Sequence, residues 1–181
     1  MTENVRSRMI EFLPRLRRFA YALTRNMELA DDLVQDTCER ALSRAEQWQP
    51  GTRLDSWMYR IAQNIWFDQG RSAKVRGELT DLDSIGELTG TDGRTVTENR
   101  LTLASVFESM ERLPRDQQVL VALVCVEGLS YKEAAENLDL PIGTVMSRLA
   151  RARQAIAAAV DGQPDSKKVV VLEERRGGKH T

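Results

Sequence analysis

The stretch that most constrains the fold is residues 128–153, GLSYKEAAENLDLPIGTVMSRLARAR. Ser130 and Glu133 have the spacing of a capping box, in which a hydroxyl and a carboxylate bind the free amides at the start of a helix. Leu140-Pro141 predicts the end of that helix, because the residue before a proline is biased away from helical geometry. The stretch therefore predicts two helices that are joined by a turn.

The second of these helices is expected to have two chemically different sides. Apolar residues recur at spacings of 4, 3 and 4, which predicts a buried stripe. Hydroxyls and guanidinium groups lie on another side, as a helix that reads the major groove of DNA requires. Helical pairs of this kind also occur in proteins that never bind DNA, so the pattern leaves both interpretations open. The stripe is Val145, Leu149, Ala152 and Ile156, and the polar side carries Thr144, Ser147, Arg148 and Arg151.

The composition of the 181 residues limits the class of protein. An apolar content of 41% is enough for packed cores, and no run approaches the ~18 apolar residues that span a membrane. Because the formal net charge is −1, any binding to nucleic acid must use local basic patches. The N-terminus lacks the apolar core of a signal peptide, and Cys38 and Cys125 are lone thiols. We therefore expect a cytoplasmic protein without membrane insertion.

Helical periodicity dominates residues 1–73 and predicts three or more helices there. Asn26 is expected to end the first helix. Thr52, followed by Asp55, is expected to cap the third helix as a capping box. The stripes expected to face a core are Ile10, Leu13, Leu16, Phe19, Ala20 and Leu23 on the first helix, Leu29, Leu33, Val34, Ala41 and Leu42 on the second, and Leu54, Met58, Ile61 and Ile65 on the third.

Residues 74–98 differ from both flanking segments. They are rich in Gly, Thr, Asp and Glu and have weak periodicity, which predicts a flexible acidic linker. A second helical domain is expected over residues 99–161, and a disordered tail over 162–181. The apolar run 119–126 is compatible with a strand or a helix, and helix is preferred because no second strand is available to pair with it. The expected fold class is all-α, with two small helical domains.

Catalytic chemistry is hard to place in this chain. The one histidine, His180, lies in the expected tail, and no cluster of residues has the spacing of metal ligands. Asp31 and Asp32 are adjacent, and adjacent side chains diverge by about 100° on a helix. They therefore form either a solvated acidic face or a docking surface for a basic partner. We expect no catalytic residue, metal or cofactor.

Three segments, taken in order, resemble a bacterial RNA polymerase sigma factor of the extracytoplasmic-function (ECF) type. They are residues 30–42 (ADDLVQDTCERAL), residues 53–71 (RLDSWMYRIAQNIWFDQGR) and the helix-turn-helix at 128–153. The resemblance covers about residues 8–160. It implies a sigma region 2-like domain in the first half, which docks on polymerase and reads and melts the −10 element. A region 4-like domain in the second half would read the −35 element.

For the first domain, the resemblance implies a role for each of several polar residues. The acidic helix would dock on basic residues of the core polymerase through Asp31, Asp32, Gln35 and Asp36. Asn64 would line the pocket for a flipped −10 base, although an asparagine can equally end a helix. The aromatic residues Trp57, Trp66 and Phe67 could stack on bases or belong to the core. The side chains placed near the unpaired −10 strand are Arg60, Gln63, Trp66 and Arg71.

For the second domain, the resemblance implies contacts with the −35 element. Met146 stands where relatives often carry Lys or Arg, so one expected contact is absent. The residues expected to read bases in the major groove are Thr144, Ser147, Arg148 and Arg151. The residues expected to contact phosphates are Lys132 and Arg153.

The partners implied are core RNA polymerase, promoter DNA and an anti-sigma factor, and the free chain is expected to be a monomer. One alternative is a sigma-like decoy that sequesters an anti-sigma factor without binding DNA. A decoy is expected to have a degraded recognition helix or an attached receiver domain, whereas this chain keeps its arginines. A second alternative is a dimeric helix-turn-helix repressor, in which residues 1–73 would supply the dimerisation or ligand domain.

Overall fold

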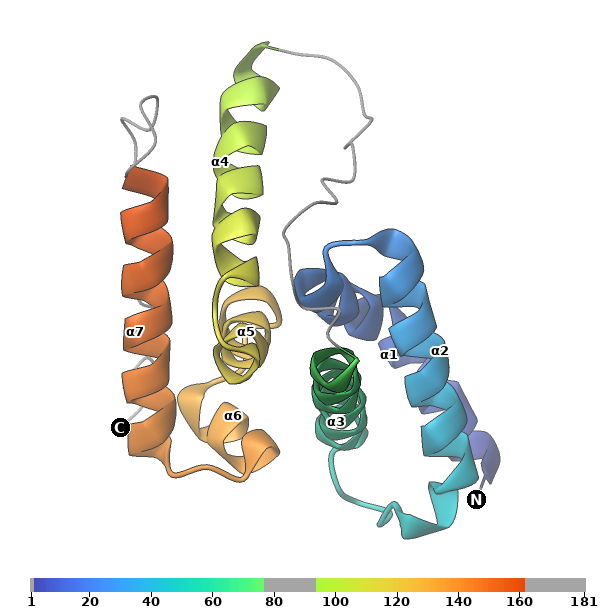
Figure 1. The fold of residues 1–181 in the computed structure, drawn as a ribbon. Coiled ribbons are helices and arrows are strands. Elements are labelled where there is room, and N and C mark those ends of the chain that lie inside the picture. Colours follow the sequence, from blue (N-terminus) through green and yellow to red (C-terminus); the bar gives the residue numbers. More distant parts are fainter. Residues whose placement is uncertain (1, 77–93, 162–181) are drawn as a thin grey trace, which may run out of the picture.

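The computed structural model describes residues 2–76 and 94–161, with side chains from 5–76 and 103–160, and contains no strand within these ranges (Figure 1). The expected all-α class with two helical domains is therefore confirmed. Most of the expected linker, residues 77–93, and the expected tail, 162–181, lie outside the described residues.

The first domain is a bundle of three long helices, α1, α2 and α3, which pack against one another (Figure 1). Its elements are α1 (Thr2–Thr24), α2 (Met27–Ser43), the 3-10 turn η1 (Ala45–Gln47) and α3 (Leu54–Val75). The first helix ends at Thr24, before Arg25 takes a left-handed φ of 57°. Asn26 therefore begins α2 rather than ending α1, since its side chain accepts a hydrogen bond from the Leu29 amide at 3.1 Å.

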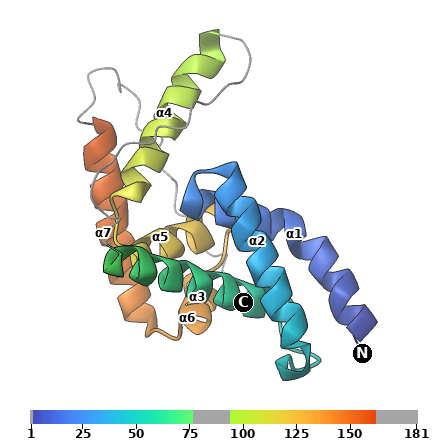
Figure 2. The same ribbon diagram turned by 45° about the vertical axis from the view of Figure 1, so that its right-hand side comes forward.

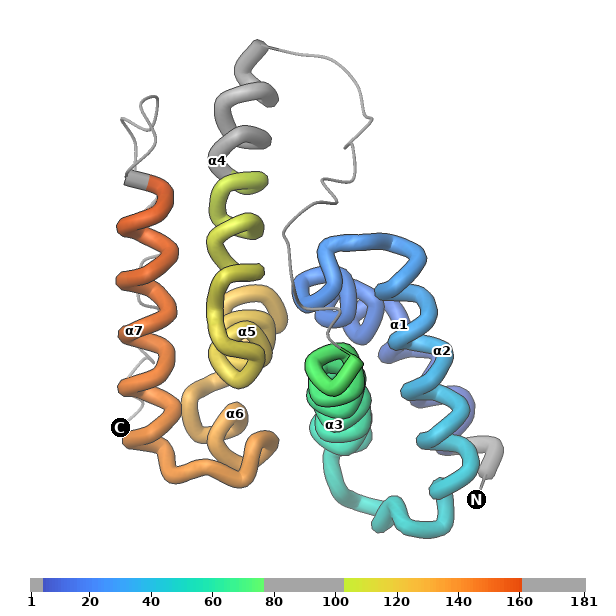
Figure 3. The backbone as a smooth tube through the Cα atoms, in the orientation of Figure 1, coloured from blue at the N-terminus to red at the C-terminus, as the bar shows by residue number. Residues whose placement is uncertain are grey.

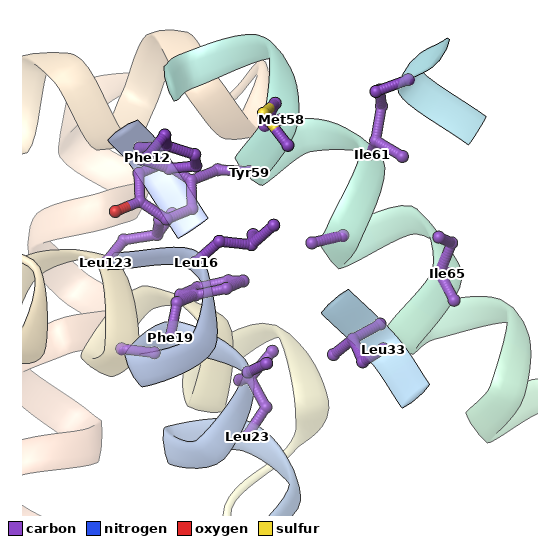
Figure 4. Close-up of a cluster of buried hydrophobic side chains, with 14 of the residues drawn as sticks. Phe12, Leu16, Phe19, Leu23, Leu33, Met58, Tyr59, Ile61, Ile65 and Leu123 are labelled. Atoms are coloured by element: carbon purple, nitrogen blue, oxygen red, sulfur yellow. The ribbon is translucent and has the colours of Figure 1, made fainter. Parts of the chain in front are cut away.

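The core of this bundle surrounds the ring of Tyr59, which is fully buried (Figure 4). The Tyr59 ring makes edge contacts with Phe12 and Phe19, each at 5.0 Å between centroids. The expected stripe was wrong at Ile10, which is 60% exposed. The buried stripe of α1 passes through Phe12 instead, and Ile10 lies about 200° around the helix from that residue.

Two other sequence expectations for this domain were also wrong. Leu29 and Leu42 are exposed, because the buried side of α2 runs through Ala30, Leu33, Thr37 and Ala41. Thr52 does not cap α3: its hydroxyl donates to the Gln49 carbonyl at 2.7 Å, within the turn that contains Gly51. The residue before α3 is Arg53, which makes no side-chain cap hydrogen bond. The expected stripe Leu54, Met58, Ile61 and Ile65 is buried.

Helix α4 starts at Arg94, inside the range expected for the linker, and α3 ends inside the same range at Val75. The elements of the second domain are α4 (Arg94–Glu111), α5 (Arg115–Val121), the π-helical turn η2 (Ala122–Val126), α6 (Tyr131–Leu138) and α7 (Ile142–Asp161). The apolar run 119–126 is helical, as expected, and its last five residues form the π-helical turn. In Figure 3, α7 runs alongside the later part of α4.

The helix-turn-helix is formed by α6 and α7. The capping box is confirmed, because the Ser130 hydroxyl accepts from the Glu133 amide and the Glu133 carboxylate accepts from the Ser130 amide. Helix α6 ends at Leu138, and the next residue, Asp139, has a left-handed φ of 54°. The expected stripe of α7 packs into the core of this domain, with Val145, Leu149 and Ala152 buried and Ile156 half-buried.

The two domains pack against each other, with α5, η2 and α6 facing α1 and α3 (Figure 2). Four buried residues of the second domain belong to the same apolar cluster as the core of the first: Val119, Ala122, Leu123 and Leu129. The remaining apolar core of the second domain lies between α4, α5, α6 and α7. The described chain is therefore one closed body in which the second domain presents α6 to α3.

Candidate nucleic-acid and partner interfaces

The acidic residues of α2 do not all face the same way. Asp32, Gln35 and Asp36 line a surface pocket of about 390 Å³, together with Thr24, Leu29, Trp66 and Gln69. Asp31 lies beside α1, where it accepts two hydrogen bonds from Arg17, at 2.7 and 3.0 Å. The structure therefore brings three of the four expected polymerase contacts to one pocket and separates the fourth.

The expected −10 residues extend along α3. Asn64 is exposed and lies inside the helix, which continues to Val75, so it does not end the helix. Arg60 and Arg71 are also exposed and lie within about 40° of Asn64 around the helix axis. Arg71 forms an ion pair with Asp68, one turn earlier on the same helix.

Two of the expected −10 residues contact α6 of the other domain. The Arg60 guanidinium donates to the backbone carbonyl of Glu136 at 2.7 Å and to that of Asn137 at 3.2 Å. The buried Gln63 side chain donates to the Asn137 carbonyl at 3.4 Å. In return, the Asn137 side chain donates to the Ser56 carbonyl at 2.8 Å. In the free chain, these donors are therefore occupied by backbone oxygens.

Trp66 is half-buried and carries a cation on its ring. The Arg115 guanidinium lies 4.0 Å from the ring centroid and donates to the Trp66 carbonyl at 2.7 Å. Gly70 allows this approach, because a Cβ at that position would lie 2.3 Å from the Arg115 Nε. Burial lowers the pKa of Arg115. Trp57 and Phe67 are half-buried against the core, as the alternative interpretation of these aromatics expected.

The expected −35 face lies on the outer side of α7. Ser147 and Arg151 are exposed, whereas Thr144 is half-buried. Arg148 is half-buried and forms an ion pair with Asp116 of α5 at 2.7 Å. The ion pair fixes the direction of the Arg148 side chain, since Asp116 belongs to a different helix. The four residues therefore lie on one helix side but differ in exposure.

The expected phosphate contacts differ from each other. Lys132 is exposed at the start of α6. Arg153 is half-buried and donates to the Tyr131 hydroxyl at 3.1 Å, so it links α7 to α6. Ile142 and Met146, which sequence reasoning did not assign to the interface, are 50% and 52% exposed on the first turns of α7. Exposed apolar groups on such a helix can contact thymine methyl groups.

Sequence reasoning also missed Glu127, a carboxylate in the turn after η2. Its side chain is fully buried, and it accepts hydrogen bonds from Arg18 at 2.7 and 3.0 Å and from the Tyr59 hydroxyl at 2.7 Å. Arg15 approaches it at 3.4 Å. Burial and the Glu127 carboxylate raise the pKa of Tyr59. A lone acid beside an apolar run and the arginine cluster of α1 were the available sequence signals.

The described ranges contain neither a cluster of metal-ligating side chains nor a helix that could span a membrane. No group of three or more His, Cys, Asp or Glu side chains there could hold a metal ion. Among the same residues, no helix has the length and apolar character needed to cross a bilayer.

Two family matches cover the helical domains. Residues 9–63 match the family described as the Sigma2 domain of PhyR, and residues 103–156 match the family described as Sigma-70, region 4. The first match contains α2 and the first half of α3, and the second contains the helix-turn-helix.

The chain is similar over its length to proteins from several bacteria. It is 34% identical, over 91% of both chains, to a Rhodopseudomonas palustris (strain TIE-1) protein named ECF RNA polymerase sigma factor EcfG. It is similar in structure to the sigma factor RpoE in complex with the anti-sigma factor NepR from Bartonella quintana, with a TM-score of 0.73 and 26% identity over 89% and 99% of the two chains. The anti-anti-sigma factor PhyR from the same bacterium, in complex with NepR, shares the fold at 16% identity and a TM-score of 0.58, over 85% of this chain and 49% of PhyR.

Proposed function

This chain belongs to the ECF family of RNA polymerase sigma factors, and we propose that it binds core RNA polymerase and directs it to promoters with a −35 and a −10 element. The observation that carries this proposal is the match to a named ECF sigma factor across 91% of both chains. The family match supports the function of an alternative sigma factor over the two alternatives, a decoy and a repressor.

The chain's part in initiation is recognition and strand separation, without bond chemistry of its own. Asp32, Gln35 and Asp36 dock on the polymerase, with the pocket between α2 and α3 receiving the partner's side chains. Asn64 receives a flipped −10 base, because an exposed amide can pair with the edge of a base. Arg60 and Arg71 supply cations for the unpaired strand.

The −35 element is read by α7. Ser147 and Arg151 project from the side of α7 opposite its buried stripe, where base edges in the major groove are within reach. Arg148 contacts guanine when its ion pair with Asp116 exchanges for a base, and Thr144 lies nearer the domain core. Lys132 contacts phosphate. The main role of Arg153 is structural, because it links α7 to α6 through the Tyr131 hydroxyl.

The further partners follow from the same assignment. The chain acts in the cytoplasm, where the polymerase is, and is a monomer when free. An anti-sigma factor is its regulator, in line with the relative RpoE, whose structure is that of a complex with the anti-sigma factor NepR.

A decoy function is the second candidate, because the first domain matches the Sigma2 domain of PhyR and a protein of that name is an anti-anti-sigma factor. A decoy needs the surface that binds the anti-sigma factor but no DNA-reading side chains. The exposed Ser147 and Arg151 of α7 favour the sigma factor, since a decoy has no use for them.

Transcription with purified components tests the proposal. The chain is mixed with bacterial core RNA polymerase and pooled genomic promoter fragments, and run-off products are compared with those of core alone. Discrete new transcripts are expected, and their start sites identify both elements. Binding to core without transcripts would favour the decoy, and binding to DNA without core would favour a repressor.

The docking assignment has its own test. Changing Asp32 and Asp36 to Lys is expected to abolish binding to core polymerase while the helical circular dichroism spectrum is retained. The double substitution Glu11→Lys and Glu46→Lys has the same effect on net charge at exposed positions outside the pocket, and it is expected to bind core normally. Equal binding by both double variants would contradict the assignment.

A further inference from the structure

Part of the α3 surface that is proposed to meet the −10 strand is in contact with the second domain, while Asn64 and Arg71 remain exposed. Helix α6 lies beside α3 (Figure 2). The carbonyl oxygens of Glu136 and Asn137 accept hydrogen bonds from Arg60 and Gln63, and the Asn137 side chain donates one to the Ser56 carbonyl. Both carbonyls lie in the last turn of α6. The contact joins residues that are more than 70 positions apart, so it is a feature of tertiary structure.

These carbonyls resemble phosphate oxygens in what they offer to Arg60. The last carbonyls of a helix have no intrahelical partner, and the helix dipole places partial negative charge at that end. A guanidinium that would bind the DNA backbone is therefore satisfied by the end of α6. Gln63, which is buried, is satisfied in the same way. Binding of a DNA strand by these two side chains requires α6 to leave.

Glu127 forms a second polar contact between the two domains. It comes from the second domain, whereas Arg15, Arg18 and Tyr59 come from the first. Its carboxylate has no exposed surface, while the Arg18 side chain is 55% exposed. A buried carboxylate is stable only while its cations and donors remain in place. Losing one of these groups therefore weakens the contact between the domains.

Apolar and rim contacts complete the closed arrangement. Leu123 and Leu129 of the second domain are buried in the apolar cluster of the first (Figure 4 shows Leu123 beside Phe12 and Leu16). At the rim, Arg53 of the first domain pairs with Glu133 of α6, and Arg115 covers Trp66.

The closed arrangement is incompatible with simultaneous binding to both promoter elements. The −35 and −10 elements are separate stretches of one duplex, and each base pair between them adds about 3.4 Å along B-form DNA. In the closed chain, α3 and α6 are within hydrogen-bonding distance. The two domains must therefore separate before each can reach its element.

We propose that the free chain is held closed by the buried Glu127 contact, and that the end of α6 acts as an internal competitor for the −10 strand until the domains separate. The competition with DNA rests on the proposed function, whereas the closed state does not. If only a tenth of the molecules are open, the apparent affinity for the strand falls about tenfold. Separation of the domains on the polymerase then restores it.

Adjacent arginines of α1 provide a matched test in the full-length chain. Arg18 binds Glu127 across the domain contact, whereas Arg17 makes an equally bidentate pair with Asp31 inside the first domain. Donor and acceptor dyes are placed at the exposed positions 46 and 154 through azide-bearing residues, and energy transfer is measured on single molecules. The parent and Arg17→Ala are expected to show one high-transfer population, and Arg18→Ala a second population of low transfer.

A second variant guards against misfolding of the first. Glu127→Gln keeps the shape of the side chain and removes the charge that the two arginines bind, and its helix content is checked by circular dichroism. It is expected to open as Arg18→Ala does. The proposal is overturned if both Arg18→Ala and Glu127→Gln stay in the high-transfer population. It is also overturned if Arg17→Ala shows as large a low-transfer population as Arg18→Ala does. Neither result depends on whether the chain supports transcription.

Binding of a single strand tests the internal competition. The probe is a fluorescein-labelled single-stranded oligonucleotide of mixed sequence at low salt, since stacking and cationic contacts tolerate most sequences. Arg18→Ala is expected to bind about tenfold more tightly than the parent. Adding Arg60→Ala to Arg18→Ala is expected to remove this gain in affinity, and that result would assign the gain to α3. If the domains open but the affinity for the oligonucleotide does not rise, the proposed competition between the end of α6 and DNA is wrong. The run-off assay decides separately whether the chain is a sigma factor.

Discussion

The two helices proposed to face promoter DNA, α3 and α7, present their polar side chains differently in the free chain. On α7, Ser147 and Arg151 are exposed, and Arg148 is held by a neighbour in its own domain. On α3, Arg60 and Gln63 are bound by backbone oxygens of the other domain. The proposed −35 surface is therefore accessible, whereas part of the proposed −10 surface is occupied by the other domain.

The difference follows from how many sides of each helix are buried. The stripe of α7 packs on one side into the core of the second domain, which leaves the opposite side to solvent. Helix α3 packs on one side into the core of the first domain and on another against α5 and α6. Packing on a second side is what engages Arg60 and Gln63, while Asn64 stays exposed.

The largest effect is expected from the apolar residues that distinguish the two cores. Leu120 and Leu123 are both fully buried on neighbouring turns, but Leu120 belongs to the core of the second domain and Leu123 to the shared one. Replacing either by Ala is expected to lower the free energy of unfolding by about 2–5 kcal/mol in urea denaturation. Only Leu123→Ala is expected to increase the radius of gyration in X-ray scattering. An equal increase in both variants would show that the shared core does not hold the domains together.

The exposed surface of α7 should respond to mutation without any change in domain arrangement. Arg148→Ala is expected to weaken binding to a −35 duplex by about 1–3 kcal/mol and to relax specificity at one base pair. Fluorescence anisotropy with duplexes that vary in the −35 element measures this. Arg112→Ala removes an exposed arginine of the same domain that also has a carboxylate partner, Glu108, and it is expected to have little effect. Unchanged binding across the duplexes would contradict the role of Arg148.

A smaller effect is expected from the partner of Arg148. Asp116→Asn removes the carboxylate that competes with DNA for this guanidinium. The pair is partly exposed, so the release is worth about 0.2–1 kcal/mol, and binding to the −35 duplex should tighten by a factor of about 1.4 to 5. The same anisotropy titration measures the change. Weaker binding would mean that Asp116 positions Arg148 for the base instead of competing for it.

The smallest effect is expected from pH, at the rim of the domain contact. The amide of Ser130 and the guanidinium of Arg53 lower the pKa of Glu133 below its ordinary value. A lowered pKa in the folded state contributes stability above the ordinary value of about 4.3, and this stability is lost as the pH falls through the folded-state value. Urea denaturation between pH 3 and pH 6 should therefore show a decline at the acid end. In Glu133→Gln the decline should be smaller, and an unchanged slope would exclude Glu133 as its source.

Local features of this fold could be predicted because they depend on neighbours within one or two helical turns. The capping box at Ser130 and Glu133 and the buried stripe of Val145, Leu149 and Ala152 are of this kind. The errors at Ile10 and Thr52 arose where several local patterns were possible and packing chose among them. Ile10 is apolar but lies on the solvent side of α1. The Thr52 hydroxyl donates to a carbonyl within its own turn instead of capping α3.

The sequence by itself determined the all-α class, the two helical domains and the outward polar side of α7, since each follows from periodicity along a single helix. Only the tertiary structure decided that Glu127 is buried against Arg18, a residue 109 positions away, and that the end of α6 covers Arg60. Such contacts depend on the angle at which two domains meet. That angle is set by the combined packing of many side chains, and no repeat in the sequence records it.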